Sequence, residues 1–279
     1  MSVINTNVSA MYSQNAMKTN ARAMSTAMEQ LSTGTRVNSA KDDAAGLAIG
    51  QNMTSQIRGL NMAVRNLNDG INMMQTAEGA MVEQSNMLQR MRELAVQSMN
   101  GTYSSTQRAY LDLEFQALNS QIDDIASNTT WNDQTLLNAD STNSTNPSGL
   151  FTFQAGHSSG QVITVEIGDM GTTSLEISAL TISTMSAATT ALGGISSALE
   201  TINKQRATIG AGINRMEYAA DNLTNISSNA TQSRSTIMDT DYAMATTQLA
   251  KTQIIQQAAT AMLAQANQQP QQVMQLLKG

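Results

Sequence analysis

The sequence predicts a mainly α-helical protein, in which long antiparallel coiled-coil helices from both chain ends accompany a small β-hairpin region in the middle. Three observations carry this prediction. Seven-residue apolar repeats run through both halves of the chain, a glycine-bounded stretch of β-branched residues lies between them, and the 279 residues include only two prolines, Pro147 and Pro270. Because proline is the strongest helix breaker, the chain before Pro147 is free to form long helices.

The first long helix is predicted over residues 44–99. Apolar side chains recur there with gaps that alternate between three and four, which is the pattern of a coiled-coil seam. At ~1.5 Å per residue such a helix is roughly 80 Å long. After Ile71 the second seam position turns polar, at Glu78, Ser85 and Arg92, so we expect that half of the helix to meet a different partner. The seam of this helix consists of Met53, Ile57, Leu60, Val64, Leu67, Ile71, Met74, Met81 and Leu88.

A second helix and a β region are predicted to follow. Apolar residues within the range 111–125 are spaced four, three, four and three apart, and residues 101–106 before them are typical of a turn, so an antiparallel helix pair is expected. Residues 151–154 and 162–167 carry β-branched and aromatic side chains between glycines, which indicates short strands or a hairpin. The Asn-, Ser- and Thr-rich residues 138–149 are expected to form a surface loop.

The seam spacing returns in the C-terminal half of the chain, where Arg206 interrupts it and glycines weaken it. Because the helices at the two ends have no partner nearby in sequence, we expect them to pack on each other, with the left-handed supercoil that a seven-residue repeat imposes. Residues 1–35 and 241–267 are largely Gln, Asn, Thr and Ala, and we expect them to be disordered in the free monomer and to fold on assembly. The C-terminal seam consists of Leu199, Ile202, Ile209, Ile213, Met216 and Leu223.

Composition argues against several kinds of partner. Charged residues are only 13% of the chain and the net charge is −6, so weak charge repulsion permits self-association. Without a Lys/Arg cluster, nucleic acid is not an expected partner. No apolar run approaches the ~20 residues of a membrane span, so we expect no membrane insertion. Residues 1–14 lack the features of a secretory signal peptide, so export would need another route.

Candidate catalytic and metal-binding residues are scarce. His157 is the only histidine and cysteine is absent, which excludes a zinc site of the usual type and any thiol chemistry. Asp42 and Asp43 could suggest an acidic metal or catalytic pair, but neighbouring carboxylates here are more typical of a helix start. We therefore expect no catalytic residue, no metal, no cofactor and no enzymatic activity.

Several separate motifs, in the correct order, resemble bacterial flagellin. Residues 4–10 are similar to the start of that family, and residues 31–49, which begin Leu-Ser-Thr-Gly-Thr-Arg-Val-Asn, are similar to its most recognisable run. Residues 258–268 and 273–277 resemble its C-terminal segment. Only residues 141–190 show no family signature, and that insert is too short for large outer domains, so the resemblance is to a short form.

The resemblance implies a structural subunit that polymerises into the bacterial flagellar filament used for swimming motility. Such subunits are exported unfolded through the flagellar type III apparatus, so we expect a secreted, extracellular protein. The implied partners are further copies of the chain, a flagellar export chaperone, a cap protein and the hook–filament junction protein. Residues 1–43 and 237–279 would form a terminal helical inner-tube domain. Residues 44–236 would form the surrounding coiled-coil bundle with the β-hairpin region, and no large outer domain is expected.

Residues 89–97 are similar to the flagellin segment that the innate immune receptor Toll-like receptor 5 senses. Arg90 and Leu94 are four residues apart and are expected to share one helix face, and arginine is favoured at interface hot spots. The resemblance implies that the receptor senses the free monomer, because the same surface is an inter-subunit contact in the filament. The predicted receptor contact consists of Gln89, Arg90, Arg92, Glu93, Leu94 and Glu114.

Two other functions fit parts of the pattern. The hook–filament junction protein shares such end helices, but it is needed in few copies and should not grow long filaments when purified. A secreted signalling or adhesive ligand would have the immune contact as its purpose, whereas we regard that contact as incidental. An inserted metalloprotease is not expected, because the chain lacks the His-Glu-X-X-His pattern.

Overall fold

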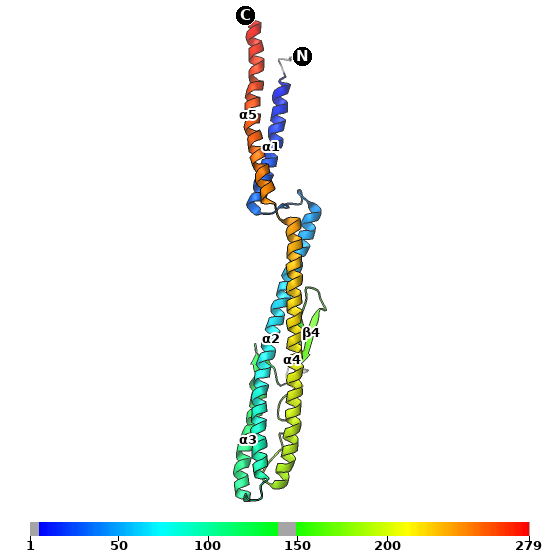
Figure 1. Cartoon of the computed structure of the whole chain (residues 1–279), viewed down its shortest axis with the longest axis vertical. Coiled ribbons are helices and arrows are strands. Elements are labelled where there is room, and N and C mark those ends of the chain that lie inside the picture. The colour runs from blue at the N-terminus through cyan, green and yellow to red at the C-terminus, as the bar shows by residue number, and fades with distance from the viewer. Residues whose placement is uncertain (1–5, 139–148, 279) are drawn as a thin grey trace. The chain divides into compact units, whose positions relative to one another are not determined.

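The computed structural model describes residues 6–138 and 149–278, with side chains described up to residue 268. The elements follow in the order α1, α2, α3, β1, β2, β3, β4, α4, α5, and most of the described residues are helical (Figure 1). The predicted mainly α-helical class with a small β region in the middle is confirmed. The loop predicted over residues 138–149 falls almost entirely outside the described residues.

The chain divides into two compact units. We call residues 1–57 with 228–279 the terminal unit and residues 58–227 the central unit. Both α2 (Ala44–Ser98) and α4 (Met185–Met238) contribute to the two units, because the division falls within these helices. The inner-tube and bundle domains were predicted with boundaries at the helix junctions instead. Those boundaries describe layers of a filament and stay a prediction.

The terminal unit is built around two helices from opposite ends of the chain. α1 (Val8–Thr33) and α5 (Tyr242–Lys278) run antiparallel along each other (Figure 1). Asn7 caps α1 by accepting a hydrogen bond from the Ala10 N–H at 3.0 Å, and its amide donates to the Ala266 carbonyl of α5 at 2.8 Å. The two chain ends therefore pack on each other, as predicted.

The fully buried side chains of α1 and α5 are small. Asn20 is among them and donates from its amide to the Thr252 carbonyl at 2.7 Å. Alanines remove little apolar surface from water, so the contact between α1 and α5 is weakly stabilised. The structure shows both segments as helices, in contrast to the disorder that we expect for the free monomer, and a weakly held pair is one that opens readily. The buried apolar side chains described in α1 and α5 are Ala10, Ala27, Ala245 and Ala266.

Residues 34–43 connect α1 to α2. Gly34 ends α1 with a φ of 72°, the left-handed conformation that glycine adopts without steric cost. The Arg36 N–H donates to the Met238 carbonyl at 2.6 Å, and the Thr240 N–H donates to the Gly34 carbonyl at 3.0 Å. The connector is thereby paired with the residues that join α4 to α5.

Two acidic residues at the end of this connector start α2. The Asp42 carboxylate accepts from the Ser39 hydroxyl at 2.9 Å and from the Ser39 N–H at 3.0 Å, and Asp43 accepts from the Gly46 N–H at 2.8 Å. The hydrogen bond from the Ser39 hydroxyl is the main reason that the pKa of the Asp42 carboxyl lies below its ordinary value. The prediction that this acidic pair marks a helix start is confirmed.

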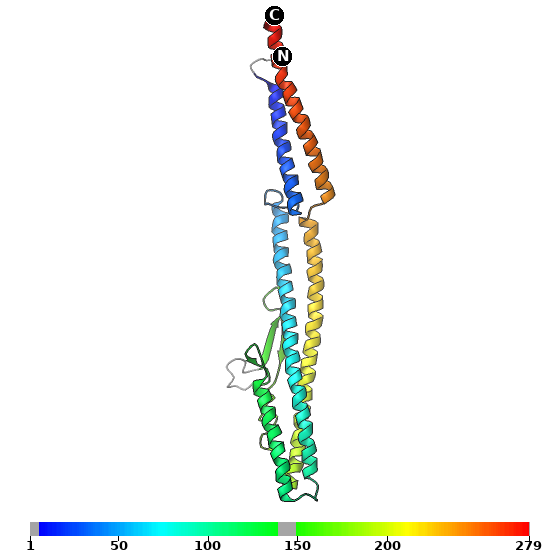
Figure 2. The ribbon, with the colours of Figure 1, turned by 90° about the vertical axis from the view of Figure 1, so that its left-hand side faces the viewer.

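The central unit is a helical bundle of α2, α3 (Ser105–Asn128) and α4. α3 runs back along the C-terminal part of α2, and α4 runs antiparallel to α2 (Figure 2). A capping box starts α3: the Ser104 hydroxyl accepts from the Gln107 N–H, and the Gln107 side chain accepts from the Ser104 N–H. Arg108 closes the turn by donating to the Ser98 carbonyl at the end of α2, at 2.8 Å. The predicted antiparallel helix pair is present.

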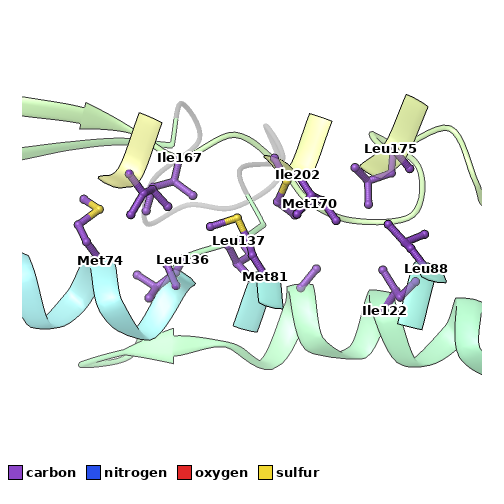
Figure 3. Packing of buried hydrophobic residues seen from close by; sticks show 14 of the residues in the cluster. Met74, Met81, Leu88, Ile122, Leu136, Leu137, Ile167, Met170, Leu175 and Ile202 are labelled. Carbon is purple, nitrogen blue, oxygen red and sulfur yellow. The ribbon is translucent and has the colours of Figure 1, made fainter. Parts of the chain in front are cut away.

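The interior of the bundle shows what the C-terminal half of α2 meets. Gln84 is fully buried and donates to the carbonyl groups of Ile122 on α3 and of Met170, at 3.2 Å each. This half of α2 therefore meets α3 and the segment after β4, and Figure 3 shows its Met81 and Leu88 in one cluster with Ile122 and Ile202. Of the predicted seam residues, Ile57, Leu60, Leu67, Met74, Met81, Leu88, Ile202, Ile209, Met216 and Leu223 are buried, and Met53, Val64, Ile71, Leu199 and Ile213 are partly buried.

Two antiparallel hairpins lie between α3 and α4 in the sequence. β3 (Leu150–Gln154) pairs with β4 (Val162–Glu166), close to where strands were predicted. β1 (Thr130–Trp131) and β2 (Gln134–Thr135) form a second hairpin that the sequence analysis missed. The signal was the Asn-Asp pair between them, residues 132–133, because these residue types tolerate the positive φ values of 49° and 63° found there.

The β3–β4 hairpin lies against glycines of the long helices. A Cβ atom added at Gly70 of α2 would come within 2.8 Å of the Phe153 ring. One added at Gly212 of α4 would come within 2.9 Å of the Val165 side chain. These two glycines therefore let the hairpin approach the helices closely.

Residues 168–184, which we call the strap, contain no helix or strand and connect β4 to α4. Side chains of α3 hold the backbone of the strap at intervals. Gln116 donates to the Leu180 carbonyl at 2.8 Å, and Asp112 accepts from the Ile182 N–H at 2.7 Å. The buried apolar side chains of the strap are Met170, Leu175, Ile177 and Ile182.

Candidate interaction surfaces

The described residues contain no cluster of histidine, cysteine or acidic side chains suited to binding a metal ion. None of the described helices combines the length and the apolar character that crossing a membrane requires. His157 lies exposed in the turn between β3 and β4. The distinctive features of the described chain are on its helix faces.

Arg90 on α2 lies between two carboxylates. Its Nη1 is 2.9 Å from Glu93 Oε2 on the same helix, and its Nε and Nη2 are each 2.9 Å from Glu114 Oε1 on α3. Hydrogen bonds to Glu93 and then to Glu114 raise the pKa of Arg90 above its ordinary value. Because all three side chains are well exposed, solvent weakens their attraction, and their main consequence is a fixed pattern of charge across α2 and α3.

A groove of about 610 Å³ adjoins these ion pairs on the other side of α2. It is lined by Gln89, Arg92, Glu93, Val96 and Gln97 of α2 and by Leu199 of α4. Residues three and four apart share a helix face, which is why Gln89, Arg92 and Glu93 line this groove together. Five of the six predicted receptor residues thus lie on two adjoining faces of α2 and α3 that meet at Glu93.

Leu94 does not belong to this surface, and its predicted place there is corrected. Its side chain is only 1% exposed and joins the buried cluster with Leu88 and Met91. A residue four positions on lies about 40° further round the helix, and here that step moves the side chain from the edge of the surface into the core. Leu94 therefore positions this part of α2 from within the core.

Exposed apolar side chains next to the ion pairs escaped the sequence analysis. Val96, Tyr110 and Leu113 are each more than half exposed, and Tyr110 lies one turn before Glu114 on α3. Aromatic side chains and arginine are enriched where protein interfaces are strongest. The seam pattern identifies only the core-facing positions. An apolar residue at a position outside the seam is the sequence feature that could have indicated these exposed side chains.

The helices α1 and α5 of the terminal unit expose many large apolar side chains. Met244 and Tyr12, for example, are 73% and 74% exposed. The fully buried apolar side chains of the α1–α5 pair are alanines, whereas these larger side chains stay exposed. Exposed apolar patches commonly mark interaction surfaces. We call the following set the terminal apolar residues: Val8, Met11, Tyr12, Met28, Tyr242, Met244, Ile254, Ile255 and Met262.

The fold and these surfaces define an α-helical structural protein that acts by association of helix faces. The N-terminal helical region of bacterial flagellin matches residues 4–142, and the C-terminal helical region of bacterial flagellin matches residues 192–277. The chain belongs to the bacterial flagellin family. It is a structural subunit that polymerises into the filament of the bacterial flagellum.

Similar proteins match this chain from end to end. A flagellin of Halalkalibacterium halodurans is 43% identical over 278 residues, which span 99% of this chain and 100% of that protein. The flagellar filament 33 kDa core protein of Treponema phagedenis is 39% identical over 285 residues, again 99% and 100% of the two chains. Because these relatives are matched over their whole length, the chain is a short flagellin without a large central domain.

Solved structures resemble the fold. The crystal structure of Bacillus cereus flagellin has a TM-score of 0.51 and 32% identity, covering 57% of this chain and 88% of that chain. A putative flagellar hook-associated protein from Vibrio parahaemolyticus has a TM-score of 0.59, with 70% and 99% of the two chains covered. Its identity is 12%, so this second similarity shows the fold alone.

Proposed function

We propose that the subunit contacts of the filament are built mainly on the terminal apolar residues of α1 and α5. The supporting observation is that the fully buried apolar side chains of this pair are alanines, while the larger terminal apolar residues are exposed. Burying one large apolar side chain fully contributes about 1.5–3 kcal/mol, whereas association costs about 4 kcal/mol or more, so several of these side chains must be buried together. Contacts between two different faces that do not close into a ring generate an open helical polymer.

Seeded growth tests this proposal. Protein dissociated in acid and returned to neutral pH with short filament seeds should lengthen them, as followed by electron microscopy. Ile254→Gln places an amide on an exposed apolar position of α5 and should raise the subunit concentration needed for elongation about tenfold, since the loss of ~1.4 kcal/mol changes an equilibrium tenfold. Gln257→Ala, an exposed polar position on the same helix, is the matched control and should elongate normally.

The same assay separates the alternatives. An unsubstituted protein that leaves the seeds short contradicts the filament role and favours a hook–filament junction protein. Normal elongation by Ile254→Gln contradicts the terminal contact while leaving the filament role intact. We assign the chain no catalytic activity, in keeping with a structural protein family.

We infer further that the chain is exported unfolded through the flagellar type III apparatus and acts outside the cell. A flagellar export chaperone, the cap protein and the hook–filament junction protein are the partners that this route implies. The exposed apolar face of α5 supports the chaperone, because such a face promotes premature association wherever monomers accumulate. Mixing the chain with the purified chaperone should slow hydrogen exchange in α5, and unchanged exchange would argue against that contact.

We also propose that Toll-like receptor 5 recognises the free monomer through Gln89, Arg90, Arg92, Glu93 and Glu114. The support is the fixed charge pattern around Arg90 and the groove beside it. Arg90→Ala removes both ion pairs and should lower signalling in a receptor reporter assay about tenfold, as expected for an interface arginine. Arg58→Ala, at an exposed arginine earlier on α2, is the control. Full signalling by Arg90→Ala would sink the proposal.

A loss of receptor signalling in Leu94→Ala has to be interpreted differently. Since Leu94 is buried, its truncation creates a cavity in the core, which typically destabilises a protein by about 2–5 kcal/mol. A loss of signal there is informative only beside an unfolding curve. We expect the loss of signal to follow the loss of folded protein.

A further inference from the structure

All the sulfur of this chain is thioether sulfur, since it has 20 methionines and no cysteine. The methionines whose side chains the structure describes include two contrasting groups. The buried ones, at most 4% exposed, are Met73, Met74, Met81, Met91, Met170 and Met216 in the central unit. The exposed ones are Met11, Met28, Met244 and Met262 on α1 and α5, at 55–73% exposed, and Met62 and Met185 in the central unit, at 47–48%.

Exposure decides which thioethers meet a dissolved oxidant. With a peroxide, a lone pair of the methionine Sδ attacks one peroxide oxygen and the O–O bond breaks. The sulfur is oxidised to the sulfoxide, and the other peroxide oxygen leaves with both hydrogens as water, so each hydrogen peroxide gives one sulfoxide and one water. The product is a polar S=O group in place of an apolar sulfur.

We propose that Met11, Met28, Met244 and Met262, the exposed terminal methionines, are an oxidation site that controls assembly. A peroxide converts them to sulfoxides, and the oxidised subunit no longer joins a filament while its central unit stays folded. The assembly part rests on the proposed function, in which the terminal apolar residues become buried between subunits. The oxidation part rests on exposure alone.

The two groups of methionines predict opposite consequences. On α1 and α5 a sulfoxide stands where an apolar side chain is to be buried on assembly, so its oxygen must lose its water without a designed partner, which weakens the contact. In the central unit Met74 and Met81 lie inside the packed cluster, out of reach of dissolved peroxide (Figure 3). Mild oxidation therefore changes the assembling surface before it reaches the core.

The experiment uses the full chain. Monomer is treated with dilute hydrogen peroxide and quenched, and the oxidation of every methionine is measured by peptide mass spectrometry. That measurement includes Met1 and Met274, which lie outside the described side chains. Each sample is then tested for seeded elongation and, by circular dichroism, for folding. The test variant carries Leu at all four exposed terminal methionines, because Met-to-Leu changes keep apolar character and volume. The matched control carries Met62→Leu and Met185→Leu, at exposed methionines of the central unit.

The expected result is an elongation rate at least about tenfold lower once the four methionines are oxidised, with the folded signal unchanged. The four-Leu variant should elongate as before oxidation, and the control should lose elongation like the unsubstituted chain. Treatment of the oxidised chain with purified methionine sulfoxide reductases should restore elongation, because these enzymes reverse the modification. If the four-Leu chain fails to fold, the pairs Met11→Leu with Met28→Leu and Met244→Leu with Met262→Leu replace it, each protecting in part.

Three results overturn the inference: full elongation by the oxidised chain, equal loss in the four-Leu variant, or oxidation of the buried methionines at the same rate as the exposed ones. Failure of the untreated chain to elongate is a different outcome. It overturns the proposed function and the control of assembly with it, while the order of oxidation is still decided by mass spectrometry.

Discussion

Single glycines determine how closely the β3–β4 hairpin approaches the long helices. In the sequence, a glycine inside a helical seam indicates only local weakness, because glycine lowers helix stability. The structure gives Gly70 a purpose, since the ring of Phe153 occupies the space that its side chain would fill. Gly79, further along the same helix, has nothing within 4 Å of that position.

These two glycines give opposite predictions. Gly70→Ala forces its new methyl group against Phe153 and should lower the free energy of unfolding by about 1–3 kcal/mol. Gly79→Ala meets open space and should raise it by up to about 1 kcal/mol, because alanine favours the helix. Urea unfolding followed by circular dichroism measures both. A Gly70→Ala chain at least as stable as the unsubstituted one would show that the hairpin does not rest on this position.

Arg90 shows what a residue pattern can and cannot supply. The sequence identified Arg90, Glu93 and Glu114 as candidate contact residues by resemblance. Their ion pairs depend on the packing of α3 beside α2, since Glu114 is 24 positions from Arg90. The prediction that Leu94 is exposed was wrong for a related reason. Whether a residue at the edge of an apolar helix face is buried depends on the segments that pack against the helix.

At the scale of elements, the connector between α1 and α2 is held by the ionised carboxylate of Asp42. Its pKa is lowered, mainly by the hydrogen bond from the Ser39 hydroxyl, so folding favours the charged form. The resulting stabilisation is fully present above the ordinary value of 3.8 and is lost as the pH falls through the lower value of the folded state. Because Asp42 is exposed, this is a local effect on the connector.

Acid should therefore loosen the connector in a defined order. The Ser39 N–H donates a hydrogen bond to the Asp42 carboxylate at 3.0 Å. This amide should lose protection against hydrogen exchange as the pH falls below 3.8, after correction for the intrinsic exchange rate. The substitution Asp42→Asn should remove this pH-dependent loss of protection. An identical loss in Asp42→Asn would assign the pH dependence to another group.

The path of the strap was not predicted by any sequence pattern. Its buried side chains lack the period of a helix or the alternation of a strand. Its path is fixed instead by polar side chains of α3, such as Gln116 and Asp112, that bond to its backbone. Such bonds satisfy the polar groups of a buried segment that has no ladder of its own.

At the scale of the whole molecule, the two units are built from different interiors. The central unit buries Leu, Ile, Met and Phe, whereas the buried apolar side chains described in the α1–α5 pair are all alanines. Stability tracks the apolar area removed from water, so the two units should differ widely in stability. The disorder that we expect for the chain ends in the free monomer stays a prediction, since the structure shows both ends as helices.

Native-state hydrogen exchange of the monomer measures this difference. Amides of α1 and α5 should be at least about 100-fold less protected than those of α2 and α4 within the central unit, because segments with few buried apolar contacts open locally. Asn20→Ala removes the buried hydrogen bond to Thr252. It should lower the free energy of opening of the α1–α5 pair by about 1 kcal/mol, and so lower the protection of its amides further. Asn15→Ala, an exposed position on α1, is the control. Equal protection across the two units would contradict the prediction.

The sequence by itself determined the helices, their antiparallel return and the seam residues, because a seven-residue repeat is a local pattern that one helix geometry satisfies. It also indicated the family, through motifs at both ends. Only the tertiary structure decided which seam half meets α3, how the strap is held, that Leu94 is core and that the terminal apolar residues of α1 and α5 are exposed. Each of these depends on contacts between segments far apart in the chain. Periodicity shows that a helix has an apolar face, but only packing shows whether that face is covered.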